Sequence, residues 1–397
     1  MDATAPVAPP SSIAGSGAEP IRLEGVGKRY PDGTVAVREL DLNFAAGELS
    51  VLVGPSGCGK TTTMKMINRI IEPTSGRILL GDDDVTRVDP VLLRRRIGYV
   101  IQSVGLFPHQ TVRRNVATVP RLLGWDKRRT RDRVEELLEL VGLDPATFGD
   151  RYPHQLSGGQ RQRAGVARAL AADPSVLLMD EPFSAVDPIV RERLQSEFLR
   201  LQETVRKTIV FVTHDIEEAV RLGDRIAVMS AGGTVEQYAP PAELLGAPAT
   251  PFVADFVGAD RGLKRLAVTS IDQADLEHPP VVHEDDGLAD ARAALEHAGA
   301  RWAVVLDDQQ RLRGWLSAER ATGSGTVREA GKRMEAWVPV DSSLKTAFAT
   351  MLQLEAGWVA VLDGDRFCGV LTPESLHAAL RRSVEGSAPE VAGAALL

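Results

Sequence analysis

The segment GPSGCGKT at residues 54–61 limits what this chain can fold into more than any other feature. It fits the phosphate-loop pattern G-x-x-x-x-G-K-[ST], follows the apolar run at residues 51–53 and precedes a helix-like stretch. In such a strand–loop–helix context, the backbone N–H groups of the loop and the N-terminus of the helix surround the phosphates of a nucleotide. A glycine-rich turn between a strand and a helix is the alternative interpretation, which the flanking segments disfavour.

The side chains of this loop have separate expected roles. Lys60 supplies a positive charge to the β- and γ-phosphates, and Thr61 offers a hydroxyl group to Mg²⁺. The predicted nucleotide-binding residues of this segment are Gly54, Pro55, Ser56, Gly57, Cys58, Gly59, Lys60, Thr61 and Thr62.

An acidic pair follows a second apolar run. In VLLMDE, residues 176–181, Asp180 ends the predicted strand and Glu181 comes directly after it. Asp180 is placed to hold Mg²⁺, directly or through water, and Glu181 is placed to polarise an attacking water. An acidic pair after a strand is more often a solvated strand end, but the phosphate loop upstream favours the catalytic interpretation.

The chain up to about residue 250 alternates apolar runs with helical stretches. The runs that end in polar residues lie at 51–54, 176–180 and 208–215. Such runs suit strands that are buried on both faces of a sheet and carry ligand groups at their C-terminal ends. Charged and apolar residues alternate at helical spacing over 127–141 and 188–205. The pattern predicts an α/β fold with a largely parallel sheet.

Composition limits the class of protein. A length of 397 residues suggests two or three domains. Only Cys58 and Cys368 are present, too few for a disulfide framework, so we expect a reducing compartment. The net charge of −8 argues against a general nucleic-acid coat. We find no apolar run long enough for a membrane span. Residues 1–20 lack the features of a secretory signal. We expect residues 1–20 and the tail 383–397 to be disordered.

Residues 156–160, LSGGQ, resemble the signature of ATP-binding-cassette (ABC) ATPases. Further elements follow in the order of that family. Tyr30 matches the aromatic residue that stacks on adenine, and Gln102 matches the glutamine that senses Mg²⁺ and the membrane partner. Asp187 lies in a segment similar to the loop that crosses the dimer interface, and His214 matches the histidine that contacts the γ-phosphate. The resemblance covers the predicted cassette, residues 21–258.

The resemblance implies a P-loop NTPase core with a helical signature subdomain, and ATP with Mg²⁺ as cofactors. It implies a head-to-tail homodimer, because in this family the signature of one copy closes over the phosphate loop of another. Ser157 and Gly159 would then bind the γ-phosphate across the interface. The remaining implied nucleotide contacts are Tyr30, Gly158, Gln160 and Asp187. The implied metal-binding residues are Thr61, Gln102 and Asp180, and the implied catalytic residues are Glu181, His214 and Gln102.

A single cassette favours a transport subunit over other ABC ATPases. The 102 residues from Gly54 to Leu156 leave no room for a long coiled-coil insertion. The basic runs at 94–96 and 127–133 suggest solvated helix faces rather than a nucleic-acid surface. The segment 104–109 resembles the surface that receives the coupling helix of a permease, with a buried loop as the alternative. We expect an energising subunit on the cytoplasmic face of a bacterial inner membrane, partnered by permease subunits and a substrate-binding protein.

Finer resemblance indicates a substrate class. The stretches GCGKTTTMKMINRIIEPTSGRI, IGYVIQSVGLFPH and RYPHQLSGGQRQR resemble the ATPase of quaternary-amine importers, which take glycine betaine, choline, carnitine or proline betaine. The ATPase does not touch the substrate, so an importer of another small solute stays open. A soluble ABC ATPase that acts on a nucleic-acid or protein assembly is a further alternative.

An internal repeat follows the cassette. Residues 300–317 match residues 356–372, and each copy predicts a helix, a strand, a turn, a strand and a helix. The repeat resembles an α+β tandem CBS pair at residues 262–382, with halves 262–322 and 323–382. Arg320 and Ser375 stand where the family motif carries an acidic ribose contact. A sensor for a regulatory ligand or for ionic strength and a dimerising clamp that binds nothing therefore both stay open.

Overall fold

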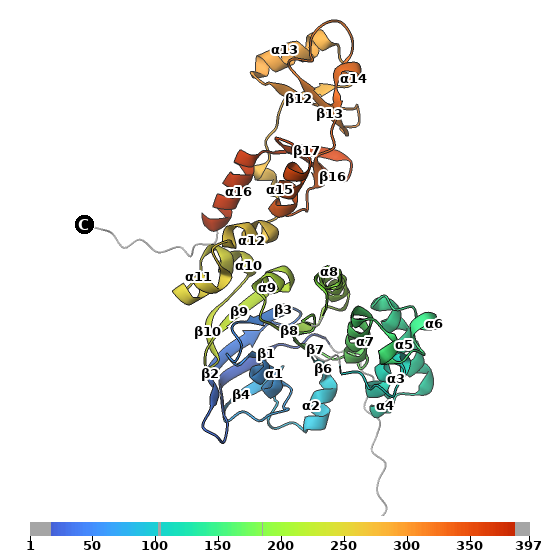
Figure 1. The fold of residues 1–397 in the computed structure, drawn as a ribbon, viewed down its shortest axis with the longest axis vertical. Coiled ribbons are helices and arrows are strands. Elements are labelled where there is room, and N and C mark those ends of the chain that lie inside the picture. The colour runs from blue at the N-terminus through green and yellow to red at the C-terminus, as the bar shows by residue number, and fades with distance from the viewer. Residues whose placement is uncertain (1–16, 102–104, 185, 386–397) are drawn as a thin grey trace, which may run out of the picture. The chain divides into compact units, whose positions relative to one another are not determined.

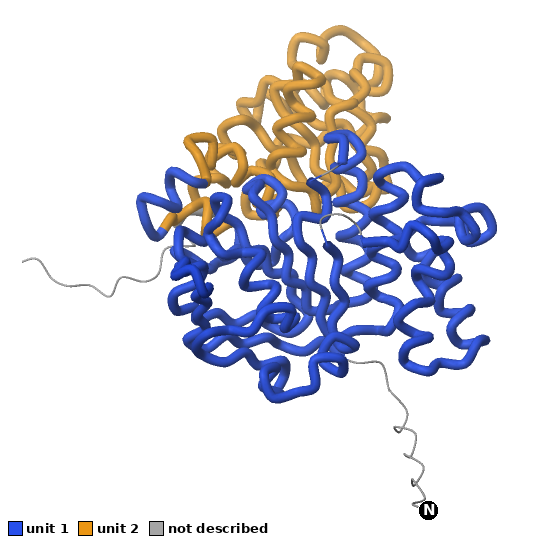
Figure 2. Tube along the Cα trace, turned by 60° about the horizontal axis from the view of Figure 1, so that its bottom comes forward, with its two compact units in different colours: residues 1–241, 249–256 blue, residues 242–248, 257–397 orange. Residues whose placement is uncertain are grey.

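We describe a computed structural model of the chain, which covers residues 17–101, 105–184 and 186–385. Gln102 and Val104 therefore lie outside the described residues. The chain divides into two compact units, residues 1–241 with 249–256 and residues 242–248 with 257–397 (Figure 2). No helix within the described residues is long and apolar enough to cross a membrane.

A six-stranded sheet forms the centre of the first unit, with the strand order β10-β9-β3-β8-β7-β6. Its members are β3 (Leu49–Val53), β6 (Ile97–Val100), β7 (Val176–Asp180), β8 (Thr208–Thr213), β9 (Arg225–Ser230) and β10 (Thr234–Ala239). All neighbours are parallel except β10 and β9. Every residue of β3, β7 and β8 is buried, which explains their continuous apolar runs. The predicted parallel α/β core is confirmed.

A second sheet of the first unit is antiparallel, with the strand order β2-β1-β4-β5. It contains β1 (Ile21–Arg29), β2 (Val35–Phe44), β4 (Ser75–Leu80) and β5 (Asp83–Asp84). Helix α1 (Lys60–Ile67) packs into a core that residues of both sheets share. Its Met64, Met66 and Ile67 are fully buried in that core, so the helix after the phosphate loop is firmly held.

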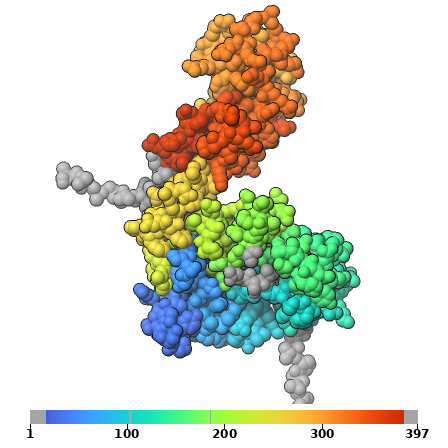
Figure 3. Space-filling model, in the orientation of Figure 1, coloured from blue at the N-terminus to red at the C-terminus, as the bar shows by residue number. Residues whose placement is uncertain are grey.

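Helices make up the rest of the first unit. The stretch between β6 and β7 contains α3 (Val112–Val116), α4 (Thr118–Leu122), α5 (Lys127–Leu140), α6 (Pro145–Phe148), a 3-10 turn (Pro153–Gln155) and α7 (Gly158–Leu170). These helices gather at one side of the central sheet and form a lobe of the surface (Figures 1 and 3). The predicted helical subdomain is thereby confirmed. The other helices are α2 (Pro90–Arg96), α8 (Pro188–Val205) and α9 (Ile216–Leu222).

Both predicted disordered ends are too long. The Glu19 carboxylate pairs with Arg96 at 2.7 Å and accepts a hydrogen bond from Ser175, and the Glu19 carbonyl accepts one from Thr208. These bonds anchor residues just before β1. At the other end, α16 (Pro373–Glu385) continues three residues into the predicted tail. Both ends are rich in small and polar residues, and this composition does not indicate that Glu19 or the end of α16 is ordered.

Two small sheets form the second unit. One has the order β11-β12-β13-β14 and the other the order β15-β16-β17. Their strands are β11 (Val281–His283), β12 (Trp302–Leu306), β13 (Leu312–Ser317), β14 (Lys332–Arg333), β15 (Trp337–Pro339), β16 (Val359–Asp363) and β17 (Arg366–Leu371). The helical elements are α12 (Arg261–Val268), a 3-10 turn (Gln273–Asp275), α13 (Leu288–Ala298), α14 (Val327–Ala330), α15 (Leu344–Gln353) and α16. Two more helices, α10 (Pro241–Gly246) and α11 (Pro251–Val257), lie where the chain passes between the units.

The predicted division of the repeat at residue 322 needs correction. Strand β14 pairs with β13, so residues beyond the predicted boundary complete the first sheet. Conversely, Leu266, Ile271 and Leu276 pack in the core of the second repeat. The first copy also lacks the predicted final helix, because turns follow β13. The first sheet thus includes a strand from the segment before the second repeat, and the core of the second repeat includes residues from the segment before the first. An alignment of the two copies does not reveal this exchange.

Trp302 and Trp358 occupy equivalent positions in the two copies and stack on each other. Their ring centroids lie 4.2 Å apart with an angle of 9° between the planes. Around them, residues of β12, β13 and β17 form a small shared cluster that includes Val304 and Val370. The two sheets therefore pair through matching positions of the repeat.

Candidate nucleotide-binding site

The phosphate loop leaves the end of β3 in the interior of the central sheet. Two of its glycines have no room for a side chain. A Cβ atom at Gly54 would lie 2.2 Å from the carbonyl oxygen of Met229. At Gly59 it would lie 2.8 Å from the carbonyl oxygen of Ala36, at a φ of 109° that L-residues rarely adopt. The glycines thus let the loop approach two neighbouring strands closely.

Lys60 is held inside this loop. Its side chain is buried, and its ammonium group donates to the carbonyl oxygens of Gly54 at 2.7 Å and Pro55 at 2.9 Å. Cys58 is buried beside it, with Sγ 3.6 Å from Nζ. Ser56 and Gly57 are exposed at the tip. The positive charge therefore sits at the centre of the loop, where the sequence places the phosphates.

Thr61 connects this loop to the acidic pair. Its hydroxyl group donates a hydrogen bond to Asp180 Oδ1 at 3.0 Å. Burial is the main cause that raises the pKa of Asp180; the bond from Thr61 lowers it, and the charge of Glu181 raises it further. Thr62 follows in the first turn of α1. A hydroxyl and a carboxylate are the hard oxygen ligands that suit Mg²⁺, and the remaining ligands of such an ion come from phosphates and water.

Glu181 has an unusual backbone. Its φ is 44°, in the left-handed region that disfavours a non-glycine residue. Its N–H donates to the Val212 carbonyl at 3.0 Å, and its own carbonyl accepts from the Ser184 hydroxyl at 2.9 Å. Such strain persists only where surrounding bonds determine it, and it clusters at functional sites.

The Glu181 side chain lies beside the residues that follow β8. There His214 Nδ1 lies 3.3 Å from Glu181 Oε1, while the imidazole remains largely exposed. Asp215 caps α9 directly afterwards and holds the chain at this point. The structure thus brings together the loop, Asp180, Glu181 and His214 at the C-terminal edge of parallel strands.

The signature residues form the start of α7. Ser157 accepts a hydrogen bond from the Gln160 N–H, and the Gln160 side chain accepts one from the Ser157 N–H. This reciprocal capping box explains why serine and glutamine stand three residues apart. Gly159 is buried, and a Cβ there would lie 3.2 Å from Val190 of α8. Gly158 has open space around it.

Three predicted contacts lie apart from this constellation. Asp187 is exposed and caps α8 by accepting from the Ile189 N–H at 3.0 Å. Tyr30 lies in the turn between β1 and β2, with Lys28 over its ring. Among the described residues, we find no hydrogen bond or ion pair that joins Tyr30, Asp187 or the signature at residues 156–160 to the phosphate loop. Gln102 is outside the described residues.

Sequence reasoning missed three polar side chains of the first unit, of which Gln195 and Glu218 are buried and Tyr99 is partly buried. Gln195 of α8 donates to Glu218 of α9 at 3.0 Å, and both side chains are buried. Burial is the main cause that raises the pKa of Glu218. Burial of Tyr99 on β6, together with the charge of Asp180, raises the pKa of Tyr99 to about 12. Gln195 and Glu218 lie on different helices, 23 positions apart, so no sequence motif linked them.

The segment expected to receive a permease is partly described. Phe107 is 40% exposed, so the alternative of a buried loop does not hold for this residue. Fully buried Asn115 shapes the turn, because its side-chain amide donates to the carbonyls of Phe107, Gln110 and Thr111. Asn115 has no apolar or motif signal in the sequence.

The family model for the ABC transporter matches residues 37–184. The glycine betaine/carnitine/choline transport ATP-binding protein OpuCA of Bacillus subtilis is 49% identical, over 75% of this chain and 78% of its own. The osmoprotectant import ATP-binding protein OsmV of Salmonella typhimurium is 44% identical, over 89% of this chain and 94% of its own. The spermidine/putrescine import ATP-binding protein PotA of Chromobacterium violaceum is 49% identical, over 60% of this chain and 64% of its own.

A solved structure is also similar to part of this chain. The dimeric ATP-binding cassette MJ0796, in a post-hydrolysis state bound to ADP and Pi, is 34% identical with a TM-score of 0.51. The likeness covers 56% of this chain and 98% of that one.

Proposed function

The chain belongs to the ABC transporter family of ATP-binding proteins, and from this membership we propose that it powers import of quaternary-amine osmoprotectants through a separate membrane permease. The family binds ATP and couples its hydrolysis to transport. The observation that carries the motor function is the hydrogen bond from Thr61 to Asp180, beside the contact between Glu181 and His214. These contacts unite the phosphate loop and the acidic pair at one edge of the sheet.

The extent of similarity supports the substrate class. The osmoprotectant relative OsmV matches 89% of this chain, so its alignment includes most of the second unit. The polyamine relative matches only 60% of the chain. Similarity to the cassette alone supports the shared motor, whereas similarity that continues into the second unit supports the narrower substrate class. We therefore favour quaternary amines over polyamines as the transported solute.

The proposal assigns a chemical role to each residue of the nucleotide site. Lys60 binds the phosphates, and Thr61 and Asp180 would hold Mg²⁺, which supplies charge neutralisation at the phosphates when bound. Glu181 accepts a proton from the attacking water, and His214 orients the Glu181 carboxylate through their 3.3 Å contact.

The assembly we propose is a head-to-tail homodimer attached to permease subunits. Ser157 and Asp187 are exposed at the starts of α7 and α8, and Ile189 next to Asp187 is 83% exposed. A second copy that covers these residues would complete the site across the interface. The solved relative MJ0796 is a dimer, which supports this arrangement. We further propose that the second unit is the tandem CBS pair and regulates the motor, with a substrate-binding protein delivering the solute.

A soluble ABC ATPase acting on nucleic acid is the alternative. The contacts of the basic run at residues 94–96 argue against a nucleic-acid surface there. Arg96 forms ion pairs with Asp83 and Glu19, and Arg94 donates to the Arg69 carbonyl at 2.6 Å. These two guanidinium groups serve the fold rather than a phosphate backbone.

Uptake of labelled glycine betaine tests the proposal. The chain is co-expressed with its permease and binding protein in a host that lacks osmolyte uptake, beside the variant Lys60→Ala and the exposed-lysine control Lys345→Ala. We expect uptake that Lys60→Ala abolishes and Lys345→Ala preserves. An assembled, ATP-hydrolysing complex that imports putrescine but no quaternary amine would refute the substrate class. Nucleic-acid-stimulated hydrolysis without a permease would instead support the alternative.

A further inference from the structure

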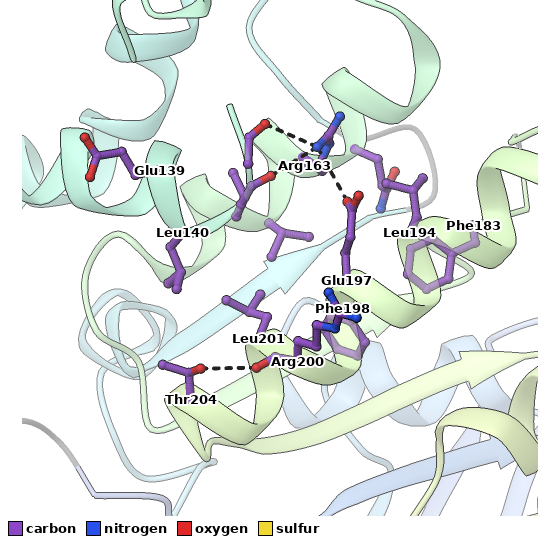
Figure 4. A pocket seen from close by; sticks show the side chains of 14 residues that line it. Glu139, Leu140, Arg163, Phe183, Leu194, Glu197, Phe198, Arg200, Leu201 and Thr204 are labelled. Carbon is purple, nitrogen blue, oxygen red and sulfur yellow. Dashed lines mark hydrogen bonds and ion pairs between the residues drawn. The ribbon is translucent and has the colours of Figure 1, made fainter. Parts of the chain in front are cut away.

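Gln195 interrupts the apolar face of α8. Its buried neighbours on this helix are Leu194, Phe198 and Leu201, which line a pocket against the helical lobe (Figure 4). Gln195 is 5% exposed and does not line that pocket. A buried polar side chain costs free energy unless it has a hydrogen-bond partner. Gln195 therefore depends on a partner elsewhere in the first unit.

That partner is the Glu218 carboxylate of α9. Gln195 Nε2 donates to Glu218 Oε1 at 3.0 Å, and Glu218 is also buried. Burial raises the pKa of Glu218, while hydrogen bonds from Thr213 and Gln195 lower it. Two donors from different elements thus meet at one buried carboxylate, where little water competes with them. Glu218 fastens α8 to the end of β8.

The chain of hydrogen bonds continues to the residues around His214. Thr213 ends β8, is buried and comes directly before His214. The Thr213 Oγ1 atom accepts the Asp215 N–H at 3.1 Å, and Asp215 Oδ1 accepts the Glu218 N–H at 3.4 Å. The residues on both sides of His214 are therefore bonded to Glu218. Because the His214 imidazole is largely exposed, its placement depends on these anchors of the backbone.

The other end of this chain of bonds lies at the start of α8. Arg191 Nη2 donates to the Val186 carbonyl at 3.1 Å, directly before the exposed cap residue Asp187. The charge of Arg191 also interacts with the Glu218 carboxylate. Asp187 is where the proposed second copy would cover the protein. A shift of α8 at this interface acts on Glu218 through both Gln195 and Arg191.

We propose that Gln195, Glu218 and Thr213 form a positioning relay, in which the placement of α8 sets the placement of His214. The inference rests on the proposed homodimer and on the proposed role of His214. Each residue of the relay acts through the imidazole that orients Glu181. Replacing both partners of a buried hydrogen bond by apolar groups of the same shape can be nearly neutral for stability. The expected contribution of the relay is therefore to geometry and turnover.

NMR of the full-length protein tests the relay directly. The imidazole signals of His214 are identified by their absence in His214→Ala. Gln195→Met removes the donor to Glu218 at nearly constant volume. Gln202→Met is the matched control, because Gln202 lies on the same helix and donates to backbone carbonyls instead of Glu218. We expect the His214 signals to move in Gln195→Met and to stay unchanged in Gln202→Met.

ATPase kinetics of the full-length protein, assembled with its permease, supply the second readout. Thr213→Val removes the hydroxyl group at the other end of the relay and keeps the shape of the side chain. We expect Gln195→Met and Thr213→Val to lower kcat by about tenfold, the effect of one lost hydrogen bond. The KM for ATP stays unchanged because the phosphate loop is intact, and Gln202→Met keeps its kcat.

Unmoved His214 signals in Gln195→Met, or equal losses of kcat in Gln195→Met and Gln202→Met, would overturn the relay. A rise in KM without a fall in kcat would overturn it too, since these residues would then affect binding alone. His214→Ala separates this inference from the proposed function. Full turnover by His214→Ala would refute the role proposed for His214, whereas impaired His214→Ala beside normal Gln195→Met would overturn the relay alone.

Discussion

The hydroxyl group of Thr61 donates a 3.0 Å hydrogen bond to the carboxylate of Asp180, although the two residues are 119 positions apart. The bond joins the first turn of α1 to the end of β7. It fixes the hydroxyl and the carboxylate that would share one metal ion, before any ion binds. The phosphate loop and the acidic pair, found separately in the sequence, therefore form one preorganised site.

Substitution of Asp180 by asparagine separates charge from hydrogen bonding. Asp180→Asn keeps an acceptor for Thr61 but removes the negative charge that attracts Mg²⁺. We expect nucleotide binding to persist and Mg²⁺-dependent hydrolysis to fall by about a hundredfold or more. An ATPase assay over a Mg²⁺ titration measures this, with the exposed helix-cap variant Asp126→Asn as a control. Unchanged Mg²⁺ dependence would show that Asp180 has no part in metal binding.

Glu181→Gln tests the proposed proton acceptor. The amide keeps the shape of the side chain and still contacts His214, but it takes no proton from water. We expect ATP binding to remain and hydrolysis to stop, so that ATP traps a closed dimer. Gel filtration with ATP detects the dimer, and Lys60→Ala, which weakens ATP binding, is expected to stay monomeric. Normal turnover by Glu181→Gln would remove this residue from the base role.

The sequence predicted that the phosphate loop and the acidic pair lie at one edge of the sheet, because both motifs follow strands with clear apolar runs. Gly54 follows buried strand β3, and Asp180 ends buried strand β7. In a parallel sheet the C-terminal ends of such strands lie at the same edge, so the two motifs were expected to meet there. The helices at 127–141 and 188–205 were also predicted within one residue, because their alternation is strong. Local patterns thus sufficed wherever burial on both faces or helical periodicity was clear.

Contacts between distant segments escaped prediction. The anchoring of Glu19 by Arg96, the pair of Gln195 with Glu218 and the exchange of β14 between the repeats each depend on tertiary proximity. A polar side chain in a one-dimensional pattern looks solvated whether or not a distant partner buries it. The antiparallel sheet of β1, β2 and β4 was unrecognised for a similar reason, since partly exposed strands lack continuous apolar runs.

Ser157 combines a structural role with a proposed nucleotide-binding one, and two substitutions separate them. Ser157→Ala removes the cap of α7, so we expect a loss of about 1 kcal/mol in the free energy of unfolding. Ser157→Asp retains a capping oxygen but places a negative charge where the γ-phosphate of the second copy would bind. We expect it to keep its stability in denaturant titrations and yet lose ATPase activity. Full activity of Ser157→Asp would argue against a phosphate contact.

Buried Glu218 predicts a pH-dependent stability. Burial raises the pKa of this carboxyl above its ordinary value of 4.5, so the ionised form is disfavoured in the folded chain. The stability it contributes is present below pH 4.5 and is lost as the pH rises through the folded-state pKa. We expect Glu218→Gln to raise the melting temperature at neutral pH and to lose this advantage below pH 4.5. Thermal unfolding across this range, with exposed Glu203→Gln as control, measures the difference; equal shifts at both ends would contradict it.

The stacked pair of Trp302 and Trp358 predicts an energetic link between the two repeats. The rings lie parallel with centroids 4.2 Å apart, and each repeat contributes one of them. We expect a double-mutant cycle with Trp302→Ala and Trp358→Ala to give a coupling free energy of about 1 kcal/mol, beyond the cost of lost apolar burial. Denaturant unfolding of the full chain supplies the four values. Trp315 lies in the same sheet but contacts Lys332 instead, so a cycle of Trp315→Ala with Trp358→Ala should be additive. Additivity of the stacked pair as well would mean that the repeats associate through the surrounding aliphatic residues alone.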